Sequence, residues 1–348
     1  MGGKLFETIT ISIGKKCPQS CSFCYHGASE NGYLFSEEID KLESFLSGLD
    51  VIPKRIILAG NDPLLYVATS ARIISFIRKN YAQTEVEILT NLLSFDWLLN
   101  KYVEMERNGA VDSTYEIILS AGLAVTIDHR KELPCSWVPS GLVENLNVEN
   151  AMFTFSSDTE NTSPEFIIEW AKLLHTEVVR INLDFSSKGK TKNPYALVRK
   201  VVSMIKYGIK NGIYVLGDWD TILTSMIDNE HGHYCGGGDA YLTAAGTFAC
   251  AYIKDIKHDN SPANAGQTKE TYGKLREAME RLRQNVVKRR GCNTCKLEKW
   301  CSGGCLAVDT YLFCNFMRGM TDAFENDKEF RAVYLPQESK MIHDEQSQ

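Results

Sequence analysis

The sequence from Lys16 to Gly27 reads Lys-Cys-Pro-Gln-Ser-Cys-Ser-Phe-Cys-Tyr-His-Gly, and it decides how the rest of the chain is interpreted. Its cysteines, Cys17, Cys21 and Cys24, are separated by three residues and then by two. Thiolates are the usual protein ligands of iron in iron–sulfur clusters, so three on one short loop can hold a single cluster. On a four-iron cube they leave one iron open to a small molecule that binds through amino and carboxylate groups.

The position of this motif favours an α/β barrel. It follows a strand-like run from Phe6 to Ile13, and the loops after the strands of such barrels carry the chemistry. From the spacing alone, a zinc knuckle or a partial set of disulfides remains an alternative.

Short strand-like runs alternate with helical periodicity from Leu5 to about Asn211, which predicts repeated βα units. The expected strands are 6–13, 55–60, 85–91, 124–128, 151–156 and 178–184, and the expected helices include 64–77, 95–108, 163–174 and 194–210. This gives six strand–helix units, although residues 115–128 could hold two strands.

Several of the expected strands carry apolar side chains on one face and polar ones on the other. Residues 9, 11 and 13, for example, are isoleucines, and residues 8, 10 and 12 are threonines or serine. A closed barrel fills its interior with branched apolar residues, so a polar inner face indicates an incomplete barrel around a wet cavity. The alternative is an antiparallel sheet with one solvated face.

The three-cysteine motif, with Phe23 before its last cysteine, resembles the signature of the radical S-adenosylmethionine (SAM) enzymes. The resemblance implies that the open iron binds SAM and that an electron from the cluster cleaves it to a 5′-deoxyadenosyl radical. Further matches are Gly60-Asn61-Asp62-Pro63, which stands where the family has Gly-Gly-Glu-Pro to bind the SAM amino group, and Asn91 at the end of the next strand. By polarity and position, Ser156 and Arg180 are candidate contacts for the SAM ribose and carboxylate.

A second group of cysteines fills the last third of the chain. Residues 235–250 read as a short hairpin with a cysteine at each end, and a charged helical segment, 269–290, follows. The remaining cysteines have the spacing C-x2-C-x5-C-x3-C and then a final cysteine; they are Cys292, Cys295, Cys301, Cys305 and Cys314. Four cysteines with such spacing could hold zinc, but seven are too many for one zinc ion and one short of two.

This pattern resembles the SPASM extension of radical SAM enzymes that modify peptides and proteins. One spacing is a residue short, since Gly246 and Cys250 are separated by three residues where the family has four. The resemblance implies two auxiliary clusters. The outer one would use Cys292, Cys295, Cys301 and Cys314, and the nearer one would use Cys235, Cys250 and Cys305. The nearer cluster then lacks a fourth thiolate, which a substrate thiolate, Asp239 or a water molecule could replace.

Composition excludes several other classes of protein. A net charge of −6 gives no electrostatic argument for binding nucleic acid or an anionic membrane. Neither a signal peptide nor an apolar run of about 18 residues is present, so we expect a cytoplasmic protein. Ten of the eleven cysteines lie in the two groups, and only Cys135 lies outside them, which favours metal ligation over disulfides.

We therefore expect an α/β protein with a partial (β/α)6 TIM barrel at 1–212, a SPASM domain at 213–318, and a C-terminal helix and tail at 319–348. The resemblance implies an enzyme with three [4Fe–4S] clusters that abstracts a hydrogen from a peptide, giving a crosslink, a thioether or an oxidation. Expected partners are a ribosomally made precursor peptide and a flavodoxin- or ferredoxin-type reductant. Because the chain begins at the first strand, a separate leader-recognition protein, or a short leader bound by the barrel, is also expected.

The sequence leaves three other functions as alternatives. A sulfatase-maturing enzyme of the formylglycine-forming type would carry an aspartate after the second SPASM cysteine, where this chain has Ala251. A dehydrogenase or epimerase of a small molecule stays open, as does a non-catalytic electron carrier, which would need no SAM motif. The candidate bases are Asp218, Asp220 and Asp239.

Overall fold

The computed structural model of the chain divides into two compact units. Unit 1 comprises residues 1–126, 135–149 and 236–282, and unit 2 comprises 127–134, 150–235 and 283–348. Within them, the structure describes residues 8–14, 39–47, 52–60, 62–91, 104, 108, 113–126, 146–156, 159–184, 193–232, 239–243, 246–248, 257–258, 268–306 and 310–335.

Unit 1 is built on a sheet with the strand order β10-β9-β8-β1-β2-β3-β4. Its strands are β1 (Thr8–Ser12), β2 (Arg55–Ala59), β3 (Glu85–Thr90), β4 (Gly122–Thr126), β8 (Asp239–Thr243), β9 (Gly246–Phe248) and β10 (Lys257–His258). The pairs from β1 to β4 are parallel, as the alternation of strands and helices predicts. The expected hairpin is also present, with Thr243 opposite Gly246, and its first strand pairs in parallel with β1.

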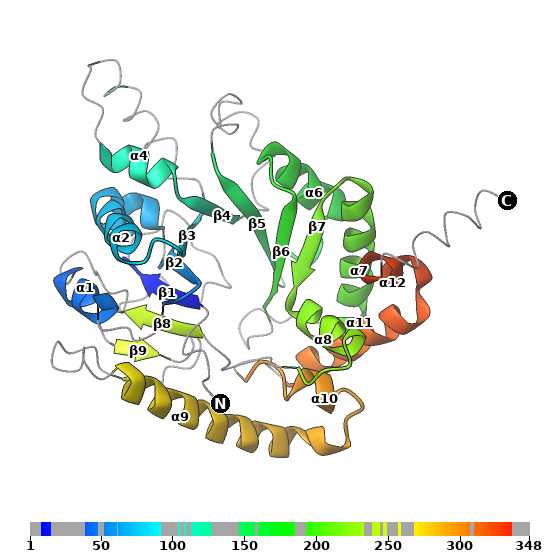
Figure 1. Ribbon diagram of the computed structural model, residues 1–348. Helices are drawn as coiled ribbons and strands as arrows, with labels where there is room; N and C mark the ends of the chain where they lie inside the picture. Colours follow the sequence, from blue (N-terminus) through cyan, green and yellow to red (C-terminus); the bar gives the residue numbers. More distant parts are fainter. Residues whose placement is uncertain are drawn as a thin grey trace. The chain divides into compact units, whose positions relative to one another are not determined.

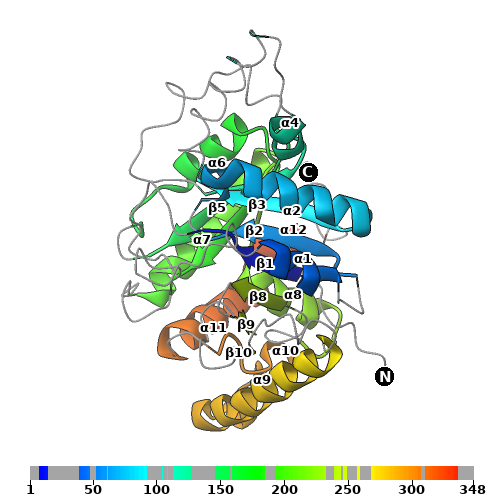
Figure 2. The ribbon, with the colours of Figure 1, turned by 90° about the vertical axis from the view of Figure 1, so that its left-hand side faces the viewer.

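Helices α1 (Ile39–Ser47), α2 (Val67–Asn80) and α4 (Ser113–Leu119) lie together against one face of this sheet (Figures 1 and 2). The apolar faces of the strands turn toward them, so Ile9 and Ile11 are completely buried. The ambiguous stretch 115–128 resolves into the helix α4 followed by one strand, β4. Of the helix expected at 95–108, only Glu104 and Asn108 are among the described residues.

Unit 2 contains the parallel strands β5 (Val148–Phe155, from residue 150 onward), β6 (Val178–Leu183) and β7 (Tyr214–Gly217). Helices α6 (Pro164–Leu173) and α7 (Pro194–Lys210) cover their apolar face, where Phe153, Val179 and Ile181 are buried (Figure 1). Each of these helices starts with a proline after a capping side chain, Ser163 or Asn193, which fixes its first turn.

The strand–helix alternation continues past Gly212, where the sequence predicts that it stops. Strand β7 pairs with β6, and α8 (Asp218–Ile227) follows it and packs on both strands. The expected boundary between barrel and extension therefore falls before a strand that belongs to the sheet of unit 2.

The remaining helices of unit 2 come from the last quarter of the chain. They are the end of α9 (Thr268–Arg290), η4 (Cys292–Thr294), α10 (Glu298–Cys301), α11 (Thr310–Asn326) and α12 (Lys328–Tyr334). Helix α11 packs on α7 and α8, and α12 packs on α7 and α11 through the completely buried side chain of Phe330. The C-terminal helix expected from the sequence is therefore anchored in the core of unit 2.

Candidate functional site

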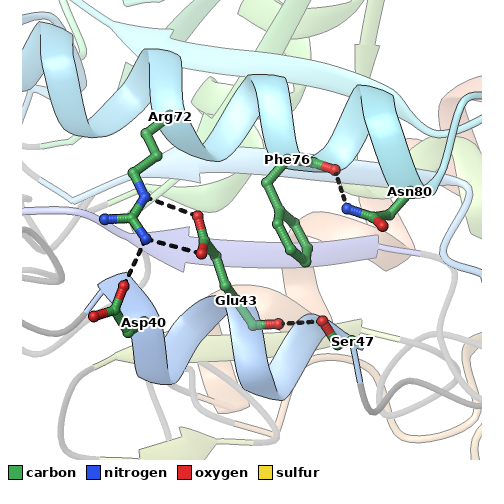
Figure 3. Close-up of polar contacts among 6 residues, drawn as sticks. All are labelled: Asp40, Glu43, Ser47, Arg72, Phe76 and Asn80. Carbon is green, nitrogen blue, oxygen red and sulfur yellow. Dashed lines mark hydrogen bonds and ion pairs between the residues drawn. The ribbon is translucent and has the colours of Figure 1, made fainter.

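The ends of the three-cysteine loop are fixed to unit 1, although the loop itself, residues 15–38, lies outside the described residues. At its start, Ile13 N donates to Ala59 O at 2.8 Å. At its end, α1 is held on α2 because the Arg72 guanidinium binds Glu43 at 2.9 Å and Asp40 at 2.5 Å (Figure 3). A bidentate contact between arginine and a carboxylate has a fixed geometry, so the pair of Arg72 and Glu43 orients α1.

Gly60 brings the end of β2 into contact with the end of β1. Its φ is +87°, and a Cβ atom there would lie 2.4 Å from Ser12 Oγ and 3.0 Å from Ile13 N. Only glycine fits both the backbone angle and the spacing.

Asp62 is buried and caps the short helix η1 (Pro63–Tyr66). Its Oδ1 accepts hydrogen bonds from Leu64 N at 3.1 Å and from Thr90 Oγ1 at 3.0 Å. The carboxylate thus ties the end of β2 to the end of β3, where Asn91 is also buried. Unit 1 therefore gathers Gly60, Asp62 and Asn91 beside the start of the cysteine loop, while Asn61 lies outside the described residues.

Ser156 and Arg180 lie in unit 2, in different settings. Ser156 is completely buried after β5, where Ser156 N donates to Thr159 Oγ1 at 2.6 Å and the Thr159 hydroxyl donates to Thr154 O at 2.7 Å. Arg180 is exposed on the face of β6 that is opposite the buried Val179. Their expected contacts with SAM stay predictions.

The candidate bases also differ in their surroundings. Asp218 is exposed in the first turn of α8, and Asp239 begins β8, opposite Thr8. Asp220 has a structural role: one oxygen accepts from Gly217 N and the other from Tyr334 Oη at 2.6 Å. The same tyrosine oxygen accepts from Trp219 Nε1 at 3.0 Å, so this network fastens α12 to α8.

Burial raises the pKa of Asp220 to about 6, because a buried carboxylate is less well solvated than a free one. A raised native pKa means that the folded chain binds the proton more tightly than the unfolded chain, so stability falls as the pH rises from about 4 to about 6. We expect Asp220→Asn to remove this component, which is up to about 3 kcal/mol.

Urea unfolding of both proteins between pH 4 and pH 7 tests this expectation, with Asp218→Asn as the control at the exposed neighbouring acid. The difference in unfolding free energy between the Asp220 variant and the unmodified chain should change across this range. A pH-independent difference would show that Asp220 titrates normally.

Four of the five cysteines that the structure describes line one pocket in unit 2. The pocket has about 340 Å³ of empty space, counting the part that is open to solvent, and Leu297, Met317, Glu298 and Arg318 also contribute to its wall. The cysteines in its wall are Cys292, Cys295, Cys301 and Cys314. Cys305 is not among the lining residues, although it follows Cys301 by only four positions.

Within the pocket, neighbouring cysteine thiols influence one another's pKa. Burial and the neighbouring thiolates of Cys314, Cys292 and Cys295 raise the pKa of Cys301 to about 12. Thiolates so close together repel one another in a medium of low dielectric constant, so their joint ionisation needs a compensating cation. Four cysteine side chains around one pocket are a donor set that a metal group can use.

The loop from Ser302 to Cys305 is held by arginines from the end of α9. Arg290 Nη1 donates to Gly303 O at 2.7 Å and to Cys305 O at 2.9 Å, and Arg283 Nη1 donates to Ser302 O at 3.3 Å. These bonds fix the backbone on which Cys305 is carried.

The segment before Cys235 lies against α10. Gly232 N donates to Lys299 O at 3.1 Å, and the Ser302 hydroxyl donates to Gly232 O. A Cβ atom at Gly232 would lie 1.6 Å from Trp300 O, so this contact excludes any other residue. Cys235 itself, like Cys250, lies outside the described residues.

Sequence reasoning missed the contacts that arginine makes here. Arg318 Nη2 donates to Cys295 Sγ at 3.8 Å. The signal was present, because Arg318 follows Cys314 by four residues within α11, and side chains at that spacing share a helix face.

Comparisons with known proteins agree with this geometry at the level of the fold. No protein-family model matches the chain. The chain is 21% identical, over 93% of its length and 73% of the relative, to the radical SAM cyclopropyl synthase TigE of Paramaledivibacter caminithermalis. The described helices include none that is both long and apolar enough to cross a membrane.

A solved structure of native anSMEcpe, with bound AdoMet and the Cp18Cys peptide, matches 94% of this chain and 98% of its own, with a TM-score of 0.63 and 15% identity. This likeness shows that the two proteins share the α/β fold of a partial barrel with a parallel sheet.

Proposed function

We propose that the chain is a radical SAM enzyme with a SPASM-type extension, that it holds three [4Fe–4S] clusters, and that it modifies a peptide. The observation that carries the proposal is the shared pocket of Cys292, Cys295, Cys301 and Cys314, from which Cys305 is absent. The SPASM pattern predicts this same division between an outer and a nearer cluster.

The residues of unit 1 fit the role of a SAM site. Gly60 and Asp62 both follow the carboxyl end of β2, and they contact the ends of the neighbouring parallel strands β1 and β3, which is where α/β folds bind ligands. Cys17, Cys21 and Cys24 would hold the cluster that binds SAM, and SAM and cluster together would supply a 5′-deoxyadenosyl radical. The carboxylate of Asp62 is a suitable partner for the SAM ammonium group, since ionised donors and acceptors make the strongest hydrogen bonds.

The geometry of the pocket favours a cluster over a zinc ion. Four thiolates on one zinc each lie about 2.3 Å from the metal, and therefore within about 4 Å of one another. Among the described residues, no three side chains of His, Cys, Asp or Glu come together closely enough to hold one metal ion. In a four-iron cluster each thiolate binds a separate iron, so the sulfurs stand farther apart around a larger volume.

The nearer cluster is supported by the contact between two chain segments. Gly232 and Ser302 are hydrogen-bonded, and Cys235 and Cys305 each follow one of them by three residues. By the SPASM pattern, Cys235 and Cys305 would serve one cluster. Cys250 would be the third ligand.

A peptide is the proposed substrate. Of the two relatives, anSMEcpe was solved with a bound peptide, and TigE is a cyclopropyl synthase. In this chain the faces of β5 and β6 that turn away from the helices carry partly exposed residues such as Thr154 and Arg180, which suits a polar chain. The reductant would be a flavodoxin- or ferredoxin-type protein.

The experiment that tests this function is SAM cleavage by the reconstituted chain. After anaerobic reconstitution and reduction, the protein should convert SAM to 5′-deoxyadenosine, measured by liquid chromatography. No 5′-deoxyadenosine with either dithionite or a flavodoxin system would favour an iron–sulfur electron carrier instead.

The role of Asp62 in binding SAM is separable from its role as a helix cap. Asp62→Asn keeps an oxygen that can accept from Leu64 N, because asparagine is as good an N-cap as aspartate, but it removes the charge. We expect SAM binding to weaken about 10- to 150-fold, the equivalent of one charge-assisted hydrogen bond, without loss of iron.

Equilibrium dialysis with labelled SAM measures this change. Thr90→Val is the matched control, because it removes the hydrogen bond to Asp62 but leaves the carboxylate in place. If Asp62→Asn binds SAM as tightly as the unmodified chain does, Asp62 is only a cap.

A further inference from the structure

Arg318 reaches the outer cysteines from the exposed side of α11. Its side chain forms part of the pocket wall, and its Nη2 donates to Cys295 Sγ at 3.8 Å. Cys295 follows η4, whereas Arg318 and Cys314 share α11, so the contact links two segments that both contribute thiols.

Other described cations near the pocket donate their hydrogen bonds to oxygen atoms. Lys296 Nζ is 2.7 Å from Asp322 Oδ1, and Arg290 donates to the carbonyl groups of Gly303 and Cys305. Lys299 Nζ donates to Asn229 Oδ1 at 2.6 Å. The guanidinium of Arg318, in contrast, donates to a sulfur atom.

A hydrogen bond from a cation to a ligating thiolate draws negative charge away from the metal centre. Reduction adds an electron to the cluster, so the reduced form gains more from a nearby positive charge than the oxidised form does. Hydrogen bonds to the sulfurs and nearby charge are among the factors that set the potentials of such clusters.

We propose that Arg318 raises the reduction potential of the cluster held by Cys292, Cys295, Cys301 and Cys314. The inference rests on the proposed function, because it requires that the pocket holds an iron–sulfur cluster. Arg318 is a tuning residue here, because it acts on the cluster through Cys295.

The expected effect is moderate because Arg318 is exposed to solvent. Exposed charge pairs are weakened by water and by salt. We expect Arg318→Gln to shift the equilibrium toward the oxidised cluster about fivefold, which is about 40 mV to more negative potential for a one-electron couple. Raising the salt concentration should lower the potential of the unmodified chain and should change that of the variant much less.

The test is a redox titration of the reconstituted full chain followed by electron paramagnetic resonance. The outer cluster is identified as the signal that disappears in Cys301→Ala. Arg318→Lys, which keeps the charge, should retain part of the effect. Lys210→Gln is the control, because it removes another exposed cation, whose partner is Glu329, 3.6 Å away.

A cluster signal in Arg318→Gln with the same potential and the same salt dependence as the Lys210 variant would overturn the proposal. If Arg318→Gln fails to assemble the cluster, the proposal is tested on the unmodified chain and on Arg318→Lys. A reduction potential of the outer cluster that does not depend on salt in these two proteins contradicts the proposal. A protein without any cluster signal that depends on Cys301 would instead contradict the proposed function, so the two failures are distinguishable.

Discussion

Replacing Cys17, Cys21 and Cys24 together by alanine is expected to abolish the formation of 5′-deoxyadenosine and to remove about four irons from each chain. The reason is that a thiolate-ligated cluster has no substitute ligands once its three cysteines are gone. The loss should be complete, because the electron that cleaves SAM comes from this cluster. The signals of the other two clusters should remain visible, since their ligands lie in the last third of the chain.

Cys135→Ala is the matched control for this triple variant, because Cys135 belongs to neither group of cysteines. It should keep its iron and its activity. Continued 5′-deoxyadenosine formation by the triple variant, above the level of heat-treated protein, would show that the loop from Lys16 to Gly27 does not hold the reactive cluster.

The second large effect concerns the division of the remaining cysteines between two clusters. Changing Cys301 and Cys314 to alanine removes two ligands from the described pocket and is expected to cost about four irons. Changing Cys305 to alanine is expected to damage a different cluster, because Cys305 does not line this pocket. In a combined variant the two losses of iron should therefore add.

Iron analysis and Mössbauer spectra of the single and combined variants measure these losses. Each variant should retain the cluster of the first loop, which provides an internal standard. If the combined variant loses no more iron than the Cys301 and Cys314 variant alone, Cys305 shares their cluster and the proposed division is wrong.

Most strands and helices of the chain could be predicted from the sequence because their pattern is local. The helix expected at 194–210 has these same bounds as α7, since a capping Asn193, a first-turn proline and one apolar stripe define it. The ambiguity at 115–128 arose because Tyr115 to Leu119 is a short apolar run that suits a strand as well as a helix. Contact with α2 favours the helix, and that contact is not visible in the local sequence.

Pairings between segments that lie far apart in the chain could not be predicted from local sequence patterns. Nothing in Asp239–Thr243 indicates that β8 pairs with β1, and the strand at 214–217 is too short to show by itself that it extends the sheet. The local sequence around Asp220 suggests a free acid near a loop, whereas this residue is bonded to Tyr334, which is 114 residues away in the sequence. The division of the cysteines between clusters comes from the resemblance to the SPASM pattern, and it stays a prediction.

The metal content of the unmodified chain tests the central claim most directly. Anaerobically reconstituted protein should contain about 12 irons per chain, all in four-iron clusters by Mössbauer spectroscopy, and no stoichiometric zinc. A chain that holds about four irons together with stoichiometric zinc would contradict the account, because the pocket of Cys292, Cys295, Cys301 and Cys314 would then be a zinc site.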